Sequence, residues 1–305
     1  MPVYNDWLSF SLLIKNIAAI YKGSKFIFEI VAINDGSNDI YEKQPHEVPV
    51  EIVSLKLNVG HQRAIAIGLQ YIFQRKSNFD FVVVMDSDGE DKPEHIISLV
   101  EKCNAFKSQK IIFAQRKKRQ ESALFKVGYF FYRNMFFFLT GQKINFGNFS
   151  CIPKSLLKRV AIQDNLWNHY SGSIIQSRTP FDRVLLDRGK RYQGVSKMNF
   201  TSLILHGLSS ISVYFDSLSI RILKLSLLGV ALCFCSVLWV LYIKFFTDTS
   251  VPGWASYLIM IIFSIIIQLF SVTLVVLLMQ LSSRKNIKSP SAEVYNDFIE
   301  TIETE

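Results

Sequence analysis

Two aspartates one residue apart are the side chains of this chain best suited to hold a metal ion. Asp86 and Asp88 follow the apolar run 81–85, FVVVM, which predicts a buried strand. Carboxylates at this spacing can share a divalent cation, Mg²⁺ or Mn²⁺, and the phosphates of a bound diphosphate would complete its oxygen ligands. The alternative is a solvated turn that leads into a helix near Pro93, which explains Asp91 well but Asp86 poorly.

A second polar cluster, Asn-Asp-Gly-Ser at 34–37, follows the apolar run 26–33. Further apolar runs lie at 50–55 and 110–114, and helical patterns separate the runs. This alternation predicts an α/β domain with a largely parallel sheet. Because ligands of open α/β sheets bind beyond the carboxyl ends of the strands, we expect both polar clusters to face one site.

The apolar residues are concentrated in the last third of the chain. Residues 225–243 and 249–283 carry no charge, and 19 helical residues span about 28 Å, close to the thickness of a bilayer core. We therefore predict two transmembrane helices, at about 222–244 and 255–281, within a membrane segment 219–285. Two helices buried in a soluble core are the alternative, but soluble helices of this length rarely lack a polar face.

The charges around these spans predict their orientation. Lysines and arginines flank the outer ends of the pair, whereas the connection between them carries only Lys244 and Asp248. The positive-inside rule then places both termini and the preceding domain in the cytoplasm, as in a multi-pass protein of the cytoplasmic (inner) membrane. Because neither span is N-terminal, we expect no secretory signal.

The segments on either side of the spans have their own patterns. Residues 200–218 mix apolar residues with serines, which predicts an amphipathic helix on the membrane surface, with an ordinary domain-edge helix as the alternative. Residues 286–305 form an acidic cytoplasmic tail that we expect to be solvated and poorly ordered.

Composition narrows the class of protein. Of the 305 residues, 50% are hydrophobic and 19% charged, which excludes a disordered chain. The four cysteines have no even spacing, which excludes a disulfide scaffold. The net charge of +9 suits an anionic partner, but no nucleic-acid-binding fold is recognised, and the membrane spans account for the basic balance.

Five segments, followed by the predicted surface helix and two spans, resemble in order along the chain the motifs of family 2 glycosyltransferases of the GT-A fold. The resemblance is to their membrane-attached, polyprenyl-phosphate type, which includes dolichyl-phosphate mannose synthase and bactoprenol glucosyltransferases. The matching segments are MPVYND (1–6), INDGSND (33–39), NVGHQRAIAIGL (58–69), MDSDGEDKPE (85–94) and RYQGVSKM (191–198).

The resemblance implies a cytoplasmic GT-A domain over residues 1–199 and assigns roles within it. Asp86 and Asp88 are expected to be catalytic and to hold the metal, together with Arg191 and Lys197 as catalytic cations. The residues expected to bind the nucleotide-sugar donor are Pro2, Tyr4, Asp6, Asp35, Gly60 and Asp86. Those expected to bind the acceptor phosphate are Arg116, Arg119, Arg191, Ser196 and Lys197.

Two alternatives accompany these assignments. The basic run 116–119 also reads as a solvated loop, and the segment 191–197 as a basic patch attracted to anionic lipid headgroups. Both readings of the second segment are compatible with one another. The oligomeric state is left open, with a homo-oligomer among the alternatives.

Asn148 departs from the family pattern, because bactoprenol-type relatives carry a candidate catalytic base, an aspartate, at this place. A sugar hydroxyl needs a base, whereas a phosphate monoester, with a second pKa near ~6, is already ionised at neutral pH. Asn148 therefore favours a polyprenyl phosphate as acceptor, although Asp164, Asp182 or Asp187 could supply a base.

We thus expect an inverting transfer of a sugar to a polyprenyl phosphate for surface glycan or polysaccharide assembly. One alternative is transfer to a lipid-linked saccharide. A catalytically retired membrane adaptor is another, suggested by the short stretch Met1–Val3 where the first strand is expected, but the intact Asp86 and Asp88 pair argues against it.

Overall fold

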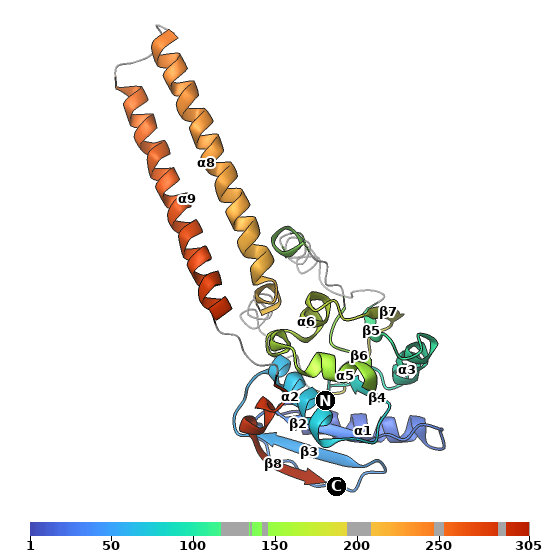
Figure 1. Cartoon of the computed structure of the whole chain (residues 1–305). Coiled ribbons are helices and arrows are strands. Elements are labelled where there is room, and N and C mark those ends of the chain that lie inside the picture. The colour runs from blue at the N-terminus through green and yellow to red at the C-terminus, as the bar shows by residue number, and fades with distance from the viewer. Residues whose placement is uncertain are drawn as a thin grey trace. The chain divides into compact units, whose positions relative to one another are not determined.

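The computed structural model describes residues 1–116, 134, 136–141, 146–193, 209–246, 253–285 and 291–304. The chain divides into two units, shown as ribbons in Figure 1. The α/β unit comprises residues 1–129, 143–213 and 289–305, and the hairpin unit comprises residues 130–142 and 214–288. The sequence predicted that the first domain ends at residue 199 and that residues 286–305 form a separate tail, whereas residues 289–305 group with the first unit.

The α/β unit contains two four-stranded sheets in its described part. The first has the order β1 (Pro2–Val3), β2 (Ile30–Asn34), β3 (Val50–Leu55), β8 (Ile299–Thr304). The second has the order β4 (Phe81–Val84), β6 (Ser150–Pro153), β5 (Ile111–Arg116), β7 (Phe181–Leu186). The fold class is the predicted α/β arrangement.

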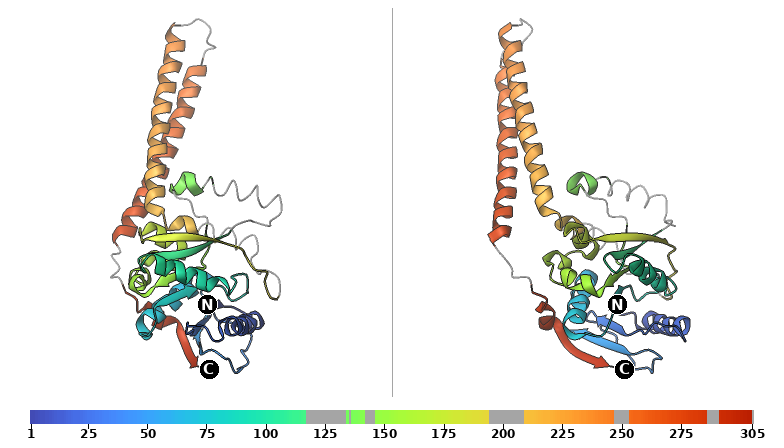
Figure 2. Two further views of the ribbon diagram at one scale, coloured as in Figure 1. Left: turned by 90° about the vertical axis from the view of Figure 1, so that its right-hand side faces the viewer. Right: turned by 45° about the vertical axis from the view of Figure 1, so that its right-hand side comes forward.

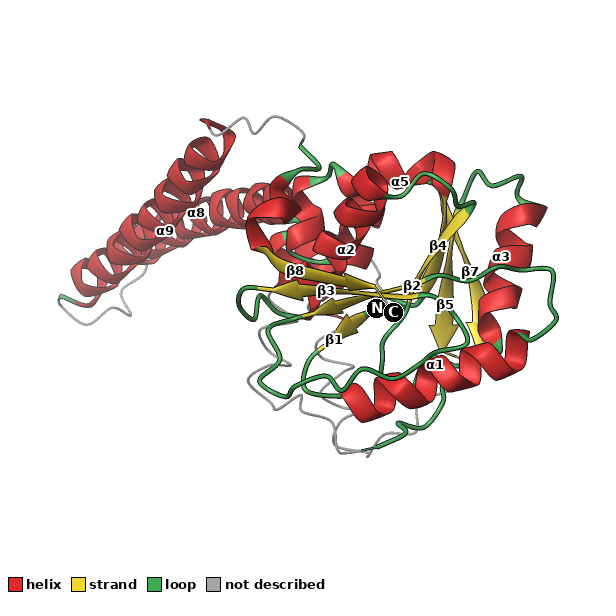
Figure 3. Ribbon diagram, turned by 90° about the horizontal axis from the view of Figure 1, so that it is seen from below, coloured by secondary structure: helices red, strands yellow, loops and turns green. Residues whose placement is uncertain are grey.

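Helices cover both faces of these strands. Figure 3 shows α2 (His61–Arg75) and α5 (Lys154–Ala161) on one side and α1 (Trp7–Tyr21) on the other. The remaining helical elements are α3 (His95–Ala105), η1 (Asp164–Trp167), α6 (Tyr170–Gln176) and η2 (Val294–Phe298).

The prediction of a largely parallel sheet is wrong in part. β1–β2, β2–β3 and β5–β7 are parallel, but β6 runs antiparallel to β4 and β5, and β8 runs antiparallel to β3. An apolar run reveals that a strand is buried but not the direction in which it enters the sheet. The sequence of the short β6 therefore did not predict its antiparallel direction.

The core beneath the sheets follows directly from helical periodicity. In α1, Trp7, Phe10, Ile14, Ile17 and Tyr21 recur at intervals of three and four residues, and all five are buried. They pack in one cluster with the inner residues of the strands and of α3. This apolar stripe holds α1 against the strands of the α/β unit.

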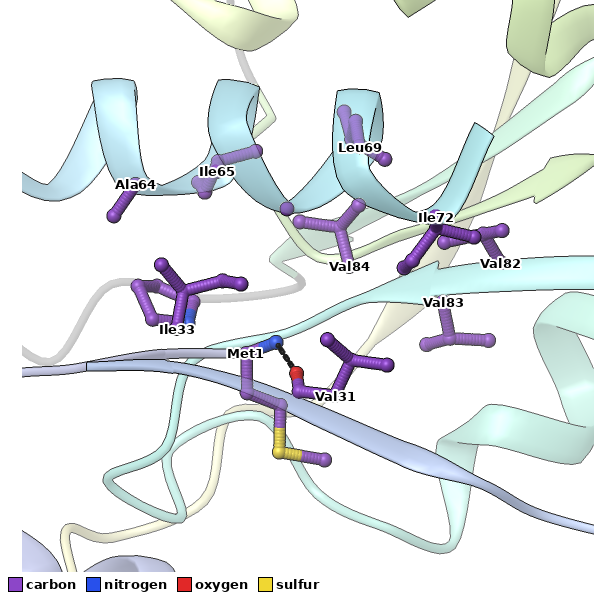
Figure 4. Close-up of a pocket in the computed structure, with 12 residues that line it drawn as sticks. Met1, Val31, Ile33, Ala64, Ile65, Leu69, Ile72, Val82, Val83 and Val84 are labelled. Carbon is purple, nitrogen blue, oxygen red and sulfur yellow. Dashed lines mark hydrogen bonds between the residues drawn. The ribbon is translucent and has the colours of Figure 1, made fainter. Parts of the chain in front are cut away.

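A small apolar cavity of about 30 Å³ lies between β2, β4 and α2. Figure 4 shows Val31, Ile33, Leu69 and Val84 around it, and the Met1 amine donating to the Val31 carbonyl at 2.8 Å. Burial lowers the pKa of this amine to about 5. Because ligand pockets usually measure about 300–1,000 Å³, this cavity is too small for a nucleotide sugar.

The acidic C-terminal segment is not the poorly ordered tail that its composition predicts. Its strand β8 extends the edge of β3 in antiparallel pairing, with Val53 opposite Ile302. Tyr295 just before it is 1% exposed and accepts a hydrogen bond at 3.2 Å from the Arg75 Nε. Composition missed this strand because backbone pairing, rather than burial of apolar side chains, holds it.

The hairpin unit contains two helices of 32 residues, α8 (Phe215–Phe246) and α9 (Trp254–Lys285). Both extend beyond the predicted spans. Residues 215–218, predicted as the end of a surface helix, instead begin α8, because no helix breaker separates them from the apolar stretch. The segment 209–212 is helical, and residues 200–208 of the predicted surface helix lie outside the described residues.

Packing within the hairpin is close, and its outer faces are apolar. Figure 2 shows α8 and α9 side by side, and a Cβ added at Gly229 would lie 2.9 Å from Leu269. Large side chains such as Leu232, Phe263 and Phe270 are more than half exposed. By length and composition, both helices could span a membrane.

Candidate active site

The loop after β4 carries the predicted pair of aspartates. Met85 is buried, and the chain then turns through Asp86, Ser87 and Asp88. Asp91 Oδ2 accepts a hydrogen bond from the Asp86 N–H at 2.9 Å. Asp91 therefore holds the turn, as the alternative interpretation expected, and leaves the two preceding carboxylates for another role.

The surroundings of the Asp88 side chain disfavour its ionised form. Its side chain is 16% exposed. Burial, and then the charge of Asp86, raise its pKa to about 6, while Arg191 works in the opposite direction. Its Oδ1 accepts the Glu90 N–H at 2.9 Å. Two carboxylates that raise each other's energy in this way would favour a bound cation between them.

Asp86 also suits a cation. Its Oδ1 is buried and accepts no hydrogen bond within the described part of the chain, although His61 Nε2 lies 3.3 Å away. Among the described residues, no group of three or more His, Cys, Asp or Glu side chains could hold a metal alone. Asp86 and Asp88 could hold a Mg²⁺ or Mn²⁺ ion only if further ligands, such as water or a diphosphate, came from outside the protein.

A strap at residues 187–193, which follows β7, lies against this loop. The Gly189 N–H donates to the Glu90 carbonyl at 2.8 Å, and the Tyr192 N–H donates to the Asp88 carbonyl at 3.0 Å. A Cβ at Gly189 would lie 2.5 Å from the Gly89 carbonyl oxygen, so only glycine permits this approach. The backbone of the strap is thus tied to the aspartate loop.

Side chains of the strap add to this attachment. Arg188 pairs with Glu90, and the Tyr192 hydroxyl accepts a hydrogen bond from Asn16 Nδ2 at 2.8 Å. Arg191 Nη2 lies 3.1 Å from Asp6 Oδ2 and 3.4 Å from Asp88 Oδ2. The structure therefore brings together four residues that the sequence predicted separately, namely Asp6, Asp86, Asp88 and Arg191.

Asp35 is positioned differently. It is 3% exposed, its Oδ1 accepts the Val59 N–H at 2.7 Å, and its Oδ2 accepts the Gly60 N–H at 3.0 Å. Burial raises its pKa, and these two N–H groups oppose the rise. Gly60, with a φ of 90°, turns the chain into α2. Asp35 thus joins the loops after β2 and β3, and its role in nucleoside binding stays a prediction.

Sequence analysis passed over His61, the first residue of α2. Its Nε2 lies 3.0 Å from Asn148 Nδ2, in addition to its approach to Asp86. Asn148 Oδ1 accepts from Gln62 Nε2 at 3.4 Å, and Gln62 Oε1 accepts the Tyr170 N–H at 2.7 Å. A histidine directly after a glycine at a helix start was the available signal, but its partners Asp86 and Asn148 lie in distant loops.

The other predicted residues are placed as follows. Pro2 is buried, and Tyr4 is 41% exposed. Asp182, a candidate base, lies 3.3 Å from the Lys102 ammonium. Arg116 ends β5, while Arg119, Ser196 and Lys197 lie outside the described residues, so their assignments stay predictions.

A sequence profile described as glycosyl transferase family 2 matches residues 1–166, which include both aspartates and the loops that hold them. The chain belongs to glycosyl transferase family 2. The protein is therefore a glycosyltransferase, as the resemblance implied.

Curated relatives of this glycosyltransferase match along most of its length. YkcC, an uncharacterized glycosyltransferase of Bacillus subtilis, is 27% identical over 278 residues, which are 85% of this chain and 80% of YkcC. The bactoprenol glucosyl transferase of Shigella phage SfV is 26% identical over 281 residues, 86% of each chain. An undecaprenyl-phosphate 4-deoxy-4-formamido-L-arabinose transferase of Photorhabdus laumondii is 25% identical over 215 residues, 67% of this chain and 63% of that protein.

Proposed function

We propose that this glycosyltransferase transfers a sugar from a nucleotide-sugar donor to a membrane polyprenyl phosphate. The observation that carries the proposal is the cluster of Asp86, Asp88 and Arg191 in a family 2 enzyme. Two of its relatives are named for transfer to undecaprenyl phosphate or bactoprenol, and its two long apolar helices suit a membrane-bound acceptor.

The donor side of the reaction follows from charge. When the bond between the sugar C1 and the diphosphate breaks, negative charge grows on the leaving diphosphate. A bound Mg²⁺ or Mn²⁺ would act as a Lewis acid that neutralises this charge. Asp86 and Asp88 would hold the cation through their carboxylates, and Arg191 lies near enough to bind phosphate oxygens by charge-assisted hydrogen bonds.

The acceptor side needs no general base. An ionised phosphate oxygen attacks C1 as the bond to the diphosphate breaks, which inverts the configuration at C1 and moves no proton. Asn148 suits this reaction because its amide orients neighbouring groups but accepts no proton at neutral pH. Transfer to a lipid-linked saccharide is the second candidate, and it would require a base such as Asp182 or Asp187.

The test is to incubate membranes containing the enzyme with a panel of radiolabelled nucleotide-sugars and then to extract lipid. We expect one donor to label a lipid from which mild acid releases a monosaccharide. Release of a larger saccharide would instead favour the second candidate. Membranes with Asp88→Asn serve as the control, and equal labelling by this variant would contradict the assigned site.

The positive-inside pattern supports a cytoplasmic α/β unit, which labelling can check. In a cysteine-free background, a cysteine at Asp248 should react with a membrane-impermeant thiol reagent added to intact cells. A cysteine at Glu300, in β8, should react only after the membrane is opened. The reverse pattern would contradict the proposed orientation.

A further inference from the structure

Arg191 has carboxylate partners before any substrate is present. Its Nη2 lies 3.1 Å from Asp6 Oδ2 and 3.4 Å from Asp88 Oδ2. The side chain of Arg191 is 24% exposed, and those of Asp6 and Asp88 are 19% and 16% exposed. One largely buried guanidinium is therefore shared between the N-cap of α1, Asp6, and the loop after β4.

The backbone that carries Arg191 is held on both sides of it. Gly189 bonds to the Glu90 carbonyl and Tyr192 bonds to the Asp88 carbonyl, at 2.8 Å and 3.0 Å. A Cβ at Gly89 would lie 2.5 Å from the Tyr192 ring, so the ring is pressed against this loop. The strap cannot leave without breaking these contacts, whereas the long Arg191 side chain can change rotamer while its backbone stays in place.

A divalent cation and Arg191 would compete for Asp88. The only carboxylate oxygen of Asp88 not bonded to the Glu90 N–H is Oδ2, the atom that faces Arg191. A cation bound by Asp86 and Asp88 would place two positive charges beside the guanidinium, and water screens their repulsion only weakly in a partly buried site. Contact with both at once is therefore unfavourable.

We propose that Arg191 is a built-in counter-ion, which holds Asp88 in the donor-free enzyme and releases it when the divalent cation binds. Asp6 remains within reach and keeps the released guanidinium beside the site, where it can grip phosphate oxygens. Cation binding thus frees the arginine that the transfer needs. This inference rests on the proposed function, because it takes Asp86 and Asp88 as the cation ligands.

Cation binding without any donor tests the proposal. The probe is Mn²⁺ alone, titrated into the detergent-solubilised full-length chain, with free Mn²⁺ measured by electron paramagnetic resonance. We expect Arg191→Ala to bind Mn²⁺ about tenfold more tightly than wild type, because Asp88 no longer has a competing partner. Transfer activity of the same variant should fall, so affinity and activity change in opposite directions.

Arg188→Ala is the matched control. It removes one positive charge from the same strap, and Arg188 also acts on Asp88 at longer range, but its contact is with Glu90. We expect this variant to change Mn²⁺ affinity by less than threefold. Arg191→Gln, which is shorter and uncharged but keeps a polar amide, replaces Arg191→Ala if thermal unfolding shows that the alanine variant is misfolded.

The outcomes separate this inference from the function on which it rests. If Arg191→Ala binds Mn²⁺ no more tightly than wild type, or no more tightly than Arg188→Ala, the counter-ion proposal is overturned while the metal site stands. If Asp88→Asn binds Mn²⁺ as wild type does, the metal site itself is overturned, and the proposal with it.

Discussion

Asp35 and Asp88 are both buried carboxylates in loops that follow strands of the α/β unit, and burial raises the pKa of each. Asp35 uses both oxygens to accept backbone N–H groups of the next loop. Asp88 uses one oxygen in this way, and the other faces a neighbouring carboxylate and an arginine. Backbone N–H groups thus satisfy both oxygens of Asp35, whereas the second oxygen of Asp88 has a side-chain partner, Arg191, that can be exchanged for a ligand.

This difference has a stability consequence with a definite sign. The pKa of Asp88 is about 6 when folded and near its ordinary value of 3.8 when unfolded. The folded chain therefore binds the proton more tightly, and the contribution of Asp88 to stability falls as pH rises from about 4 to about 6 and stays low above that range. Keeping Asp88 ionised at neutral pH costs stability that the active site requires.

The largest expected effect comes from Asp88→Asn. Transfer should fall at least a hundredfold, about 2.7 kcal/mol of transition-state stabilisation, because the cation loses a ligand. The thermal unfolding midpoint should nevertheless rise by about 2–4 °C, because removal of a desolvated charge gains about 1 kcal/mol. Radiolabel transfer and scanning calorimetry measure the two quantities. A fall in both would show that the charge of Asp88 stabilises the fold, contrary to the contrast with Asp35.

Asp182→Asn is the control for the stability part. Burial works to raise the pKa of Asp182, but the Arg183 N–H and the Lys102 side chain outweigh it and lower the pKa. Its ionised form therefore favours the folded state, and the substitution should lower the unfolding midpoint or leave it unchanged.

Removal of metal with EDTA should reproduce the activity loss of Asp88→Asn reversibly, and added Mn²⁺ should restore transfer.

Asp35→Ala should act on stability first. It leaves the part-buried N–H groups of Val59 and Gly60 without their acceptor, at a cost of about 1–3 kcal/mol. Asp35→Asn should cost less, because its amide oxygen can still accept one of the two bonds. Thermal unfolding checks this order. An unchanged midpoint together with lost donor binding would show that Asp35 serves the nucleoside rather than the loop.

Arg191→Ala should lower transfer at least tenfold, about 1.4 kcal/mol. Arg191→Lys should restore only part of the activity, because an ammonium cannot grip two oxygens as a planar guanidinium does. Sedimentation with membranes should be unchanged in both variants, since the apolar helices are intact. Full transfer combined with weaker binding to anionic vesicles would instead make Arg191 part of an electrostatic anchor.

The smallest effect is expected for Asn148→Asp. An acceptor phosphate needs no base, so the rate of transfer should change by less than threefold, although the new charge lies near His61. Initial rates at saturating donor measure this. A large gain in rate would instead indicate that the acceptor is a sugar hydroxyl, which needs a base.

Local pattern accounts for the part of the site that sequence reasoning found. Periodicity located the strand before Asp86 and Asp88, and the family resemblance supplied Asp6 and Arg191. Neither local pattern nor the resemblance could reveal that Arg191 bridges two aspartates. Asp6 and Arg191 are separated by 185 positions and meet only through the strap. His61 was missed for the same reason, since its partners Asp86 and Asn148 come from other loops.

The strand β8 has a consequence for how the protein is made. Its partner β3 leaves the ribosome early, but about 250 residues separate Val53 from Ile302. At about 5–20 residues per second, the edge of β3 remains unpaired for about 10–50 s of synthesis, while the two long apolar helices are made. The first sheet is therefore completed only at the end of synthesis, and a nascent chain stalled before residue 299 would present an open strand edge to chaperones or to other chains.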